Sequence, residues 1–315
     1  MQSAVGGFVN GVTMAINIDS ARFLLSCRRC GVSFESSLTL GRQEFYLTPA
    51  ETRRVLREQG LDPANWPELF PGTYPNYADA FWRVLGARRH ETMDASPYEG
   101  ATLTHDLNLP VPQRLHEQFT AVCDGGTLEH VFDFPRALRN CLEMIKPGGH
   151  FLGLTPANNF FGHGLYQLSP ELYFRALNAA NGFQIERMYA IELGWCHRWF
   201  EVANPATSGA RVSLINRYPV LLFLQAKKLG TVPLFDRAPQ QSDYADKWAS
   251  ATPASHATPT LLPGIARPSQ NRLLALAPRL CRAFEYFVHT RFNPAFSFRH
   301  RRSFRPIDPR RLSMP

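Results

Sequence analysis

Residues 118–156 read QFTAVCDGGTLEHVFDFPRALRNCLEMIKPGGHFLGLTP. The stretch begins with a short apolar run that stops at the sharp turn 124–126 (DGG), and a second apolar run starts at Phe151. Between them, apolar side chains recur with helical spacing as far as the turn 146–149 (KPGG). The pattern predicts a strand, a helix and a second strand. Such a unit is parallel and right-handed, so residues 124–130 should lie at the carboxyl edge of a sheet, where α/β proteins bind ligands.

The turn 124–131 (DGGTLEHV) and the strand start 146–151 (KPGGHF) resemble those of class I S-adenosylmethionine-dependent methyltransferases. The closest likeness is to small-molecule O-methyltransferases of the ubiquinone-biosynthesis type (type 11). The resemblance covers about residues 37–228 and implies a Rossmann-like α/β fold. It would have a seven-stranded, mostly parallel sheet, helices on both faces and an antiparallel last strand. The implied cofactor is S-adenosyl-L-methionine, bound across the carboxyl ends of the first, second and fourth strands.

The resemblance also implies which residues contact the cofactor. Gly41 stands where the family has a glycine-rich turn, but Arg42 follows it and is expected either to meet the cofactor carboxylate or to fill the site. Asp94 is expected to accept the ribose hydroxyls, and a turn cap is the alternative. The other implied residues are Asp106 and Leu107 at the adenine, and Asp124, Gly125 and Gly126 beside the methylsulfonium. For Asp106 the alternative is a solvated loop aspartate.

Histidine is the side chain that moves protons near neutral pH, and two histidines fall close to the expected reaction site. His163, between two glycines after the fifth strand, is the preferred general base, ahead of His130; a turn or packing role is the alternative for both. Glu129 is expected to cap the helix that follows it. The loop after the fifth strand should bind the acceptor, through Asn158, Asn159 and Tyr166.

Metal and redox sites are not indicated. Methyl transfer needs in-line approach of the acceptor and at most one base, so we expect no metal. Cys27 and Cys30 form a Cys-x-x-Cys pair, but no second pair stands at zinc-ligand spacing, and both are interpreted as ordinary reduced thiols. The N-terminus has no basic stretch before its weakly apolar part, and no apolar run approaches ~20 residues, so we expect a cytoplasmic protein.

The formal net charge of +8 lies in residues 229–315, because the residues before them carry equal numbers of basic and acidic side chains. This asymmetry favours an anionic surface as partner of the tail, with nucleic acid unlikely; a solubilising extension is the alternative. We predict four segments. They are an N-terminal helical extension (1–36), a methyltransferase-like domain (37–228), a linker (229–270) and a basic amphipathic C-terminal extension (271–315).

The sequence therefore predicts a methyltransferase that transfers a methyl group from S-adenosyl-L-methionine to an oxygen or nitrogen of a small molecule or glycan. Two alternatives stay open. One is a catalytically inactive interaction module that keeps the methyltransferase fold and has lost cofactor binding at Gly41-Arg42. The other is a scaffold whose basic tail binds membrane or nucleic acid.

Overall fold

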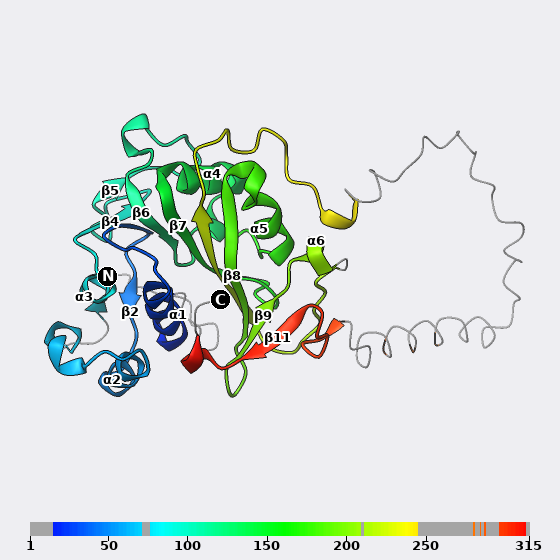
Figure 1. The fold of residues 1–315 in the computed structure, drawn as a ribbon, viewed down its shortest axis with the longest axis horizontal. Helices are drawn as coiled ribbons and strands as arrows, with labels where there is room; N and C mark the ends of the chain where they lie inside the picture. The colour runs from blue at the N-terminus through cyan, green and yellow to red at the C-terminus, as the bar shows by residue number, and fades with distance from the viewer. Residues whose placement is uncertain are drawn as a thin grey trace, which may run out of the picture.

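The computed structural model describes residues 15–70, 76–208, 211–244, 280, 284, 287 and 296–312. One nine-stranded sheet crosses this part of the chain, with helices on both faces (Figure 1). Its strands are β1 (Ser36–Leu40), β4 (Arg89–Asp94), β5 (Leu103–Thr104), β6 (Phe119–Asp124), β7 (Ile145–Pro156), β8 (Phe183–Glu192), β9 (Arg198–Val202), β10 (Val220–Lys228) and β11 (Phe304–Ile307). A separate ladder pairs β2 (Glu44–Phe45) with β3 (Asn76–Tyr77).

The strand order in the large sheet is β11-β9-β8-β10-β7-β6-β1-β4-β5. Strands β5, β4, β1, β6, β7 and β8 run in one direction, and β10 is inserted antiparallel between β7 and β8. The parallel strands therefore follow the doubly wound order 3-2-1-4-5-6. This arrangement confirms the predicted Rossmann-like α/β class, including the antiparallel last strand of the predicted seven.

The sheet is wider than the seven strands that were predicted, because β9 and β11 extend it past β8. β9 pairs with β8, and β11 pairs with β9, both antiparallel. Strand β11 comes from the predicted C-terminal extension, so residues 304–307 of that segment belong to the sheet. Residues 1–14 and 245–279, which include much of the predicted linker and amphipathic extension, lie outside the described residues. The division into four segments stays a prediction.

Two groups of helices cover the two faces of the sheet (Figure 1). One face carries α1 (Ile18–Arg29), α2 (Pro49–Glu58) and α3 (Asp79–Leu85); the other carries α4 (Phe134–Met144) and α5 (Pro170–Ala176). Alternation along β10 feeds both cores, since Leu221 and Phe223 face the first group and Leu222 and Leu224 the second. Shorter helical turns are α6 (Pro205–Ser208), η1 (Pro63–Asn65), η2 (Pro67–Leu69), η3 (Gln113–Leu115), η4 (Leu128–His130), η5 (Ala179–Asn181) and η7 (Pro309–Arg311).

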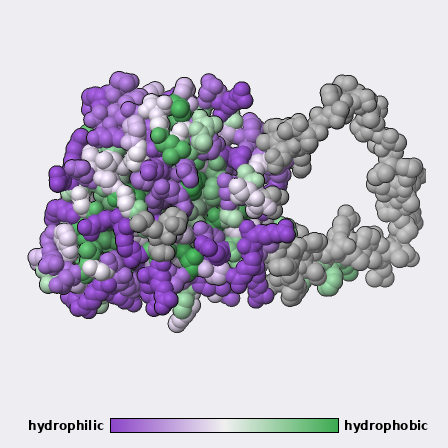
Figure 2. Space-filling model, viewed as in Figure 1, coloured by the Kyte–Doolittle hydropathy of each residue, from purple (hydrophilic) through white to green (hydrophobic). Residues whose placement is uncertain are grey.

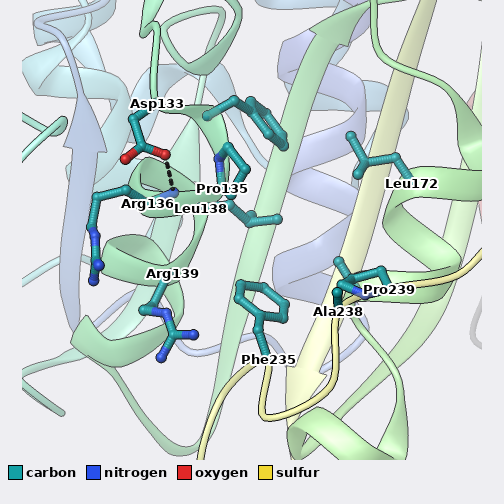
Figure 3. Close-up of a pocket in the computed structure, with 11 residues that line it drawn as sticks. Asp133, Pro135, Arg136, Leu138, Arg139, Leu172, Phe235, Ala238 and Pro239 are labelled. Atoms are coloured by element: carbon teal, nitrogen blue, oxygen red, sulfur yellow. Dashed lines mark hydrogen bonds between the residues drawn. The ribbon is translucent and has the colours of Figure 1, made fainter.

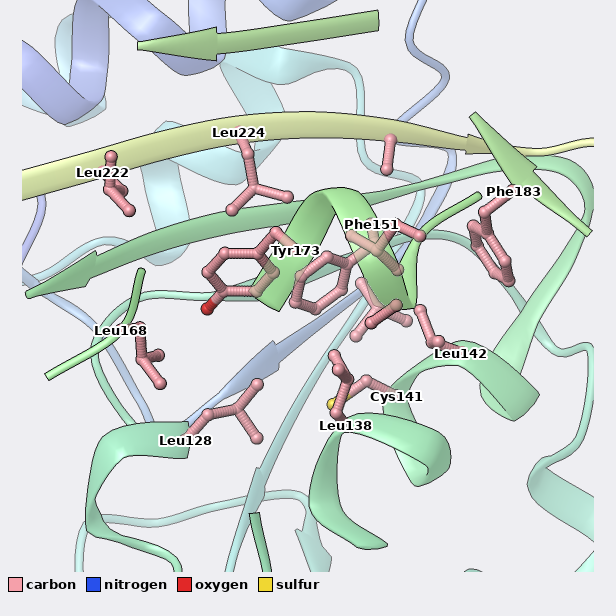
Figure 4. Close-up of a cluster of buried hydrophobic side chains, with 14 of the residues drawn as sticks. Leu128, Leu138, Cys141, Leu142, Phe151, Leu168, Tyr173, Phe183, Leu222 and Leu224 are labelled. Carbon is pink, nitrogen blue, oxygen red and sulfur yellow. The ribbon is translucent and has the colours of Figure 1, made fainter. Parts of the chain in front are cut away.

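The core beneath α4 and α5 is closely packed (Figure 4). Leu138, Cys141 and Leu142 of α4 are buried in one cluster with Phe151 of β7 and Tyr173 of α5. These α4 positions are among those whose spacing predicted the helix. Each Leu- or Phe-sized side chain stabilises the fold by about 1.5–3 kcal/mol when it is buried.

The surface shows no comparable concentration of apolar side chains in the view of Figure 2, where hydrophilic residues dominate and apolar ones form small groups. That distribution is ordinary for a folded domain. In the described ranges, no helix combines the length and the apolarity that a membrane crossing requires.

Lys228, at the end of β10, closes the carboxyl end of α4. Its side chain is 5% exposed, and Nζ donates to the carbonyl oxygens of Ile145 at 2.8 Å and Leu142 at 3.3 Å. Nζ also lies 3.3 Å from Oε1 of Glu117. The ammonium group thus satisfies carbonyl groups that the helix leaves open, and it opposes the negative end of the helix dipole.

We expect Lys228→Met to lower the free energy of unfolding by about 1–3 kcal/mol, because the change leaves two buried carbonyl groups without a donor. Lys227→Met, at the exposed neighbouring position, is the control and should change it by no more than about 0.5 kcal/mol. Urea unfolding at neutral pH measures both. Equal stability of the two variants would contradict the role assigned to Lys228.

Candidate functional site

The switch point of the sheet lies between β1 and β6. The chain leaves β1 toward α2 and α3 on one face, and it leaves β6 toward α4 on the other. Doubly wound sheets bind ligands in the crevice at this point, outside the carboxyl ends of the strands. Gly41 follows β1 here and the turn 124–127 follows β6, with Leu40 paired to Asp124 across the ladder. The predicted position of residues 124–130 at the carboxyl edge is confirmed.

The two other predicted acidic residues lie at the same edge. Asp94 ends β4, the neighbour of β1, and it pairs with Thr104 of β5, which precedes Asp106 closely. The Gly41 N–H donates to Met93 O at 2.7 Å, which ties the turn after β1 to the end of β4. Four neighbouring strand ends therefore carry the predicted cofactor residues.

Both carboxylates cap their own loops in this structure. Asp94 Oδ1 accepts the Ser96 N–H at 3.1 Å, and Asp106 Oδ1 accepts the backbone N–H of Asn108 at 2.9 Å and its side-chain amide at 2.8 Å. These hydrogen bonds from Asn108 hold the pKa of Asp106 below its usual range. The buried Leu107 accepts a hydrogen bond at its carbonyl from Asn140. The turn-cap alternative is thus present for Asp94, and Asp106 is an exposed loop aspartate, as its own alternative had it. Contact of either acid with a cofactor stays a prediction.

The Asp124 carboxylate holds the turn after β6. The side chain has no solvent exposure, and Oδ1 accepts the N–H groups of Thr127 at 2.9 Å and Leu128 at 3.3 Å. Burial raises the pKa of Asp124 to about 8, with a smaller contribution from the charge of Glu129. Thr127 Oγ1 donates to Leu40 O at 3.0 Å, which connects this turn to the end of β1. Within the turn, Gly126 has φ +99°, a conformation that side chains disfavour.

Gln43 occupies the space between the two turns. Its Nε2 donates to Leu40 O at 3.0 Å, and a Cβ placed on Gly125 would lie only 2.5 Å from Gln43 Oε1. A side chain at position 125 is therefore excluded as long as Gln43 keeps this conformation. The sequence indicated Arg42 as the residue that could fill the site; the residue in the crevice is Gln43.

The Arg42 side chain points away from Gly125 and binds the segments that surround the turn after β1. Its guanidinium donates to Asp79 Oδ2 at 2.9 Å and to Glu99 O at 3.2 Å, and its carbon lies 3.9 Å from the centre of the Tyr77 ring. These contacts join the turn after β1 to α3, to β3 and to the loop after β4. The expectation that Arg42 fills the site is wrong for this conformation.

Glu129, His130 and His163 lie together beside the turn after β6. His163 Nε2 is 3.4 Å from Glu129 Oε1, and His130 Nε2 is 4.0 Å from the same oxygen. Glu129 has no solvent exposure, and neither of its oxygens accepts a hydrogen bond from the described residues. The expected helix cap is therefore not its role; Asp133 Oδ1 accepts the Arg136 N–H at the start of α4 instead. The structure thus brings together the two candidate bases and a carboxylate that the sequence did not connect with them.

The loop after β7 is fastened to Glu129 through the backbone. Leu165 N and Tyr166 N donate to Glu129 O at 2.7 and 3.2 Å. Gly164 has φ +72°, and a Cβ there would lie 2.9 Å from the same oxygen, so the close approach requires glycine. These contacts place His163 beside the Glu129 carboxylate, although the two residues are far apart in the sequence.

The predicted acceptor-binding residues hold this loop in place. Asn158 Nδ2 donates to Leu214 O and Asn216 Oδ1, both at 3.0 Å, and Asn159 Nδ2 donates to Tyr218 O at 2.9 Å. The Tyr166 hydroxyl donates to Phe132 O at 2.6 Å. All three side chains therefore have internal partners, and a role in acceptor binding stays a prediction.

A cavity of about 440 Å³ lies on the face of the sheet that α4 and α5 cover, between these two helices and the segment that follows β10 (Figure 3). Leu138, Leu172 and Phe235 form its apolar wall, with Arg136 and Arg139 among its lining residues. Its lining includes none of the residues of the switch-point crevice, so it is a separate feature.

Comparison with known proteins finds similarity to solved structures alone. No family model and no curated protein matches the sequence. The branched-chain polyamine synthase of Thermus thermophilus, in complex with N4-aminopropylspermidine and 5'-methylthioadenosine, is 15% identical, with 71% of this chain and 59% of that chain covered and a TM-score of 0.34. The trans-methyltransferase CalH, in complex with SAH, is 12% identical, with 67% and 57% covered and a TM-score of 0.35. A SAM-dependent methyltransferase of Thermotoga maritima is 13% identical, with 67% and 91% covered and a TM-score of 0.32.

Asp124 should make stability depend on pH. Because its pKa of about 8 exceeds the ~3.9 of an unfolded aspartate, the folded state keeps a proton that the unfolded state has lost. Stability should therefore fall as pH rises from about 4 to about 8. We expect Asp124→Asn to flatten this dependence, since Asn still accepts the turn N–H groups and does not ionise. Urea unfolding at pH 5, 6.5 and 8 measures it, with the exposed helix cap Asp133→Asn as control; an unchanged slope for Asp124→Asn would contradict the assignment.

Proposed function

We propose that this chain is a methyltransferase that uses S-adenosyl-L-methionine and methylates an oxygen or nitrogen of a small molecule or glycan. What supports the proposal most is the convergence of Gly41, Asp94, Asp106 and Gly125 at one edge of a doubly wound sheet, around its switch point. A nucleoside ligand suits such an edge, because acidic side chains at strand ends accept ribose hydroxyls and glycine turns allow close backbone approach.

The residues present fit the cofactor once Gln43 changes its side-chain conformation. Gln43 holds its place with one hydrogen bond to Leu40 O. Breaking a bond of this kind costs about 0.5–1.5 kcal/mol. Asp94 would then hold the ribose, Asp106 and Leu107 the adenine, and the turn 124–126 the methionine portion.

The cofactor would supply an electrophilic methyl group, and the protein has to supply orientation and a proton acceptor. His163 is the best-placed proton acceptor, because Glu129 lies 3.4 Å from its Nε2 and can stabilise the imidazolium that forms. The loop that carries His163 is held to Glu129 by two backbone hydrogen bonds, from Leu165 N and Tyr166 N to Glu129 O. An acceptor hydroxyl or amine bound against this loop would face the turn after β6.

The position of Gln43 also favours a second function, that of an interaction module which keeps the fold without binding the cofactor. A scaffold role for the basic tail has less support. Part of its charge is neutralised internally, since Arg305 pairs with Glu201 and Arg310 with Asp308. An anionic partner for the tail remains a proposal of its own.

Asp94→Ala should weaken the binding of S-adenosylhomocysteine by about 1–3 kcal/mol, because ribose hydroxyls would lose their acceptor in a desolvated site. Isothermal titration calorimetry on the full chain measures it, with Asp62→Ala, a cap of η1, as control. Unchanged affinity in Asp94→Ala would refute the ribose contact. Absence of heat for the unsubstituted protein at millimolar ligand would favour the interaction module.

Gln43→Ala should strengthen the binding of the same ligand by up to about tenfold, since it removes the group that must be displaced at a cost of about 0.5–1.5 kcal/mol. Gln113→Ala, at an exposed position, is the control and should leave the affinity unchanged. A weaker affinity for Gln43→Ala would show that this amide binds the ligand and does not obstruct it.

A further inference from the structure

We propose that Glu129, His130 and His163 form a binding site for one divalent cation of the zinc type. Each residue offers one ligand atom, and the three ligand atoms lie within 4.8 Å of one another. Glu129 and His130 belong to η4, after β6, and His163 belongs to the loop after β7. The sequence did not indicate a metal site, because it separates His163 from the other two ligands.

The Glu129 carboxylate is the main support for the site. It is fully buried, and neither oxygen has a hydrogen-bond partner among the described residues. A buried carboxylate in that condition is costly, and such groups in proteins are paired or coordinate metals. His163 Nε2 is also buried without a hydrogen-bond partner and lies toward the carboxylate at 3.4 Å. Two ligand atoms that lack other partners therefore face each other.

The separation between the ligand atoms of His163 and Glu129 already suits a tetrahedral ion. With bonds of about 2.0–2.2 Å, a tetrahedral zinc holds its ligand atoms about 3.3–3.6 Å apart. The separation between His163 Nε2 and Glu129 Oε1 is 3.4 Å, and that between His130 Nε2 and the same oxygen is 4.0 Å. The His130 side chain is half-exposed, so its ring is free to rotate and bring Nε2 closer to the Glu129 carboxylate.

The donor set selects the type of ion. Two imidazole nitrogens with one carboxylate oxygen form a zinc-binding set that leaves the fourth position open to water or a substrate. Magnesium prefers oxygen ligands and is disfavoured by two imidazoles. Because Gly164 and the backbone of Leu165 already fasten the loop to Glu129, the ligands are assembled before an ion arrives.

A role of this cation site in catalysis rests on the proposed methyltransferase function. An acceptor hydroxyl in the open position would then lose its proton to solvent water more readily, since a bound divalent ion lowers the pKa of the oxygen it coordinates. In that state His163 would serve as a ligand in place of a base. The binding site itself does not depend on methyl transfer.

The test is metal binding by the full chain after treatment with a chelator. Zinc chloride and magnesium chloride are titrated by calorimetry, and retained zinc is measured by mass spectrometry after gel filtration. The variants are Glu129→Gln, His163→Ala and His130→Ala, the last at a half-exposed position where the fold should be unaffected. His116→Ala is the matched control, because His116 Nε2 lies 3.8 Å from Glu143 Oε2 in a comparable pair outside the cluster.

We expect one zinc per chain, an affinity reduced at least about tenfold in each of the three variants, and no change in His116→Ala. Absence of zinc binding, binding that survives all three substitutions, or a preference for magnesium would each overturn the proposal. Calorimetry with S-adenosylhomocysteine on the metal-free protein tests the methyltransferase proposal separately, so failure of one is distinguishable from failure of the other.

Discussion

Two carboxyl groups without solvent exposure, those of Asp124 and Glu129, lie close together after β6, and the geometry of the carboxyl edge depends on them. Asp124 accepts hydrogen bonds from two backbone N–H groups and so fixes the turn. The Thr127 hydroxyl donates to Leu40 O and thereby ties the turn to the end of β1. The crevice at the switch point is therefore a single hydrogen-bonded unit made from two strand ends.

Glu129 differs because neither of its oxygens accepts a hydrogen bond from the described residues, and its charged partners there are the imidazoles of His163 and His130. Stability alone does not explain such a residue, since a buried carboxylate without donors is unfavourable and an apolar side chain of similar size would pack there at less cost. Its charge also raises the pKa of Asp124, which adds to the cost. Violations of this kind concentrate at functional sites. Packing of the core does not explain why a glutamate is buried at position 129. The proposed cation site, which Glu129 forms with His130 and His163, does explain it.

Much of the fold could be predicted from local signals. The apolar spacing of α4 and the turn at 124–126 were sufficient for the strand–helix–strand unit and its right-handed connection. The arrangement of the whole sheet was predicted from the family resemblance. Strand β11 could not be predicted, because its partner β9 lies far away in the sequence. Strand β9 forms a hairpin with its neighbour β8, and it was not predicted either. The same limit applies to the site. Contact between Glu129 and His163 depends on how the loop at Gly164 folds back, which no local pattern encodes.

Arg42 and Gln43 replace the glycine-rich turn that the resemblance implies, and the two residues affect the site differently. Arg42 is held by an ion pair, a carbonyl and an aromatic ring, all outside the crevice, so it frames the site. Gln43 enters the crevice, but its side chain is held there by one hydrogen bond to Leu40 O, whose net value is about 0.5–1.5 kcal/mol. A ligand of micromolar affinity gains about 8 kcal/mol on binding, several times that cost. The side chain that closes the crevice is therefore the weakly held one, and this unusual turn remains compatible with a nucleoside ligand.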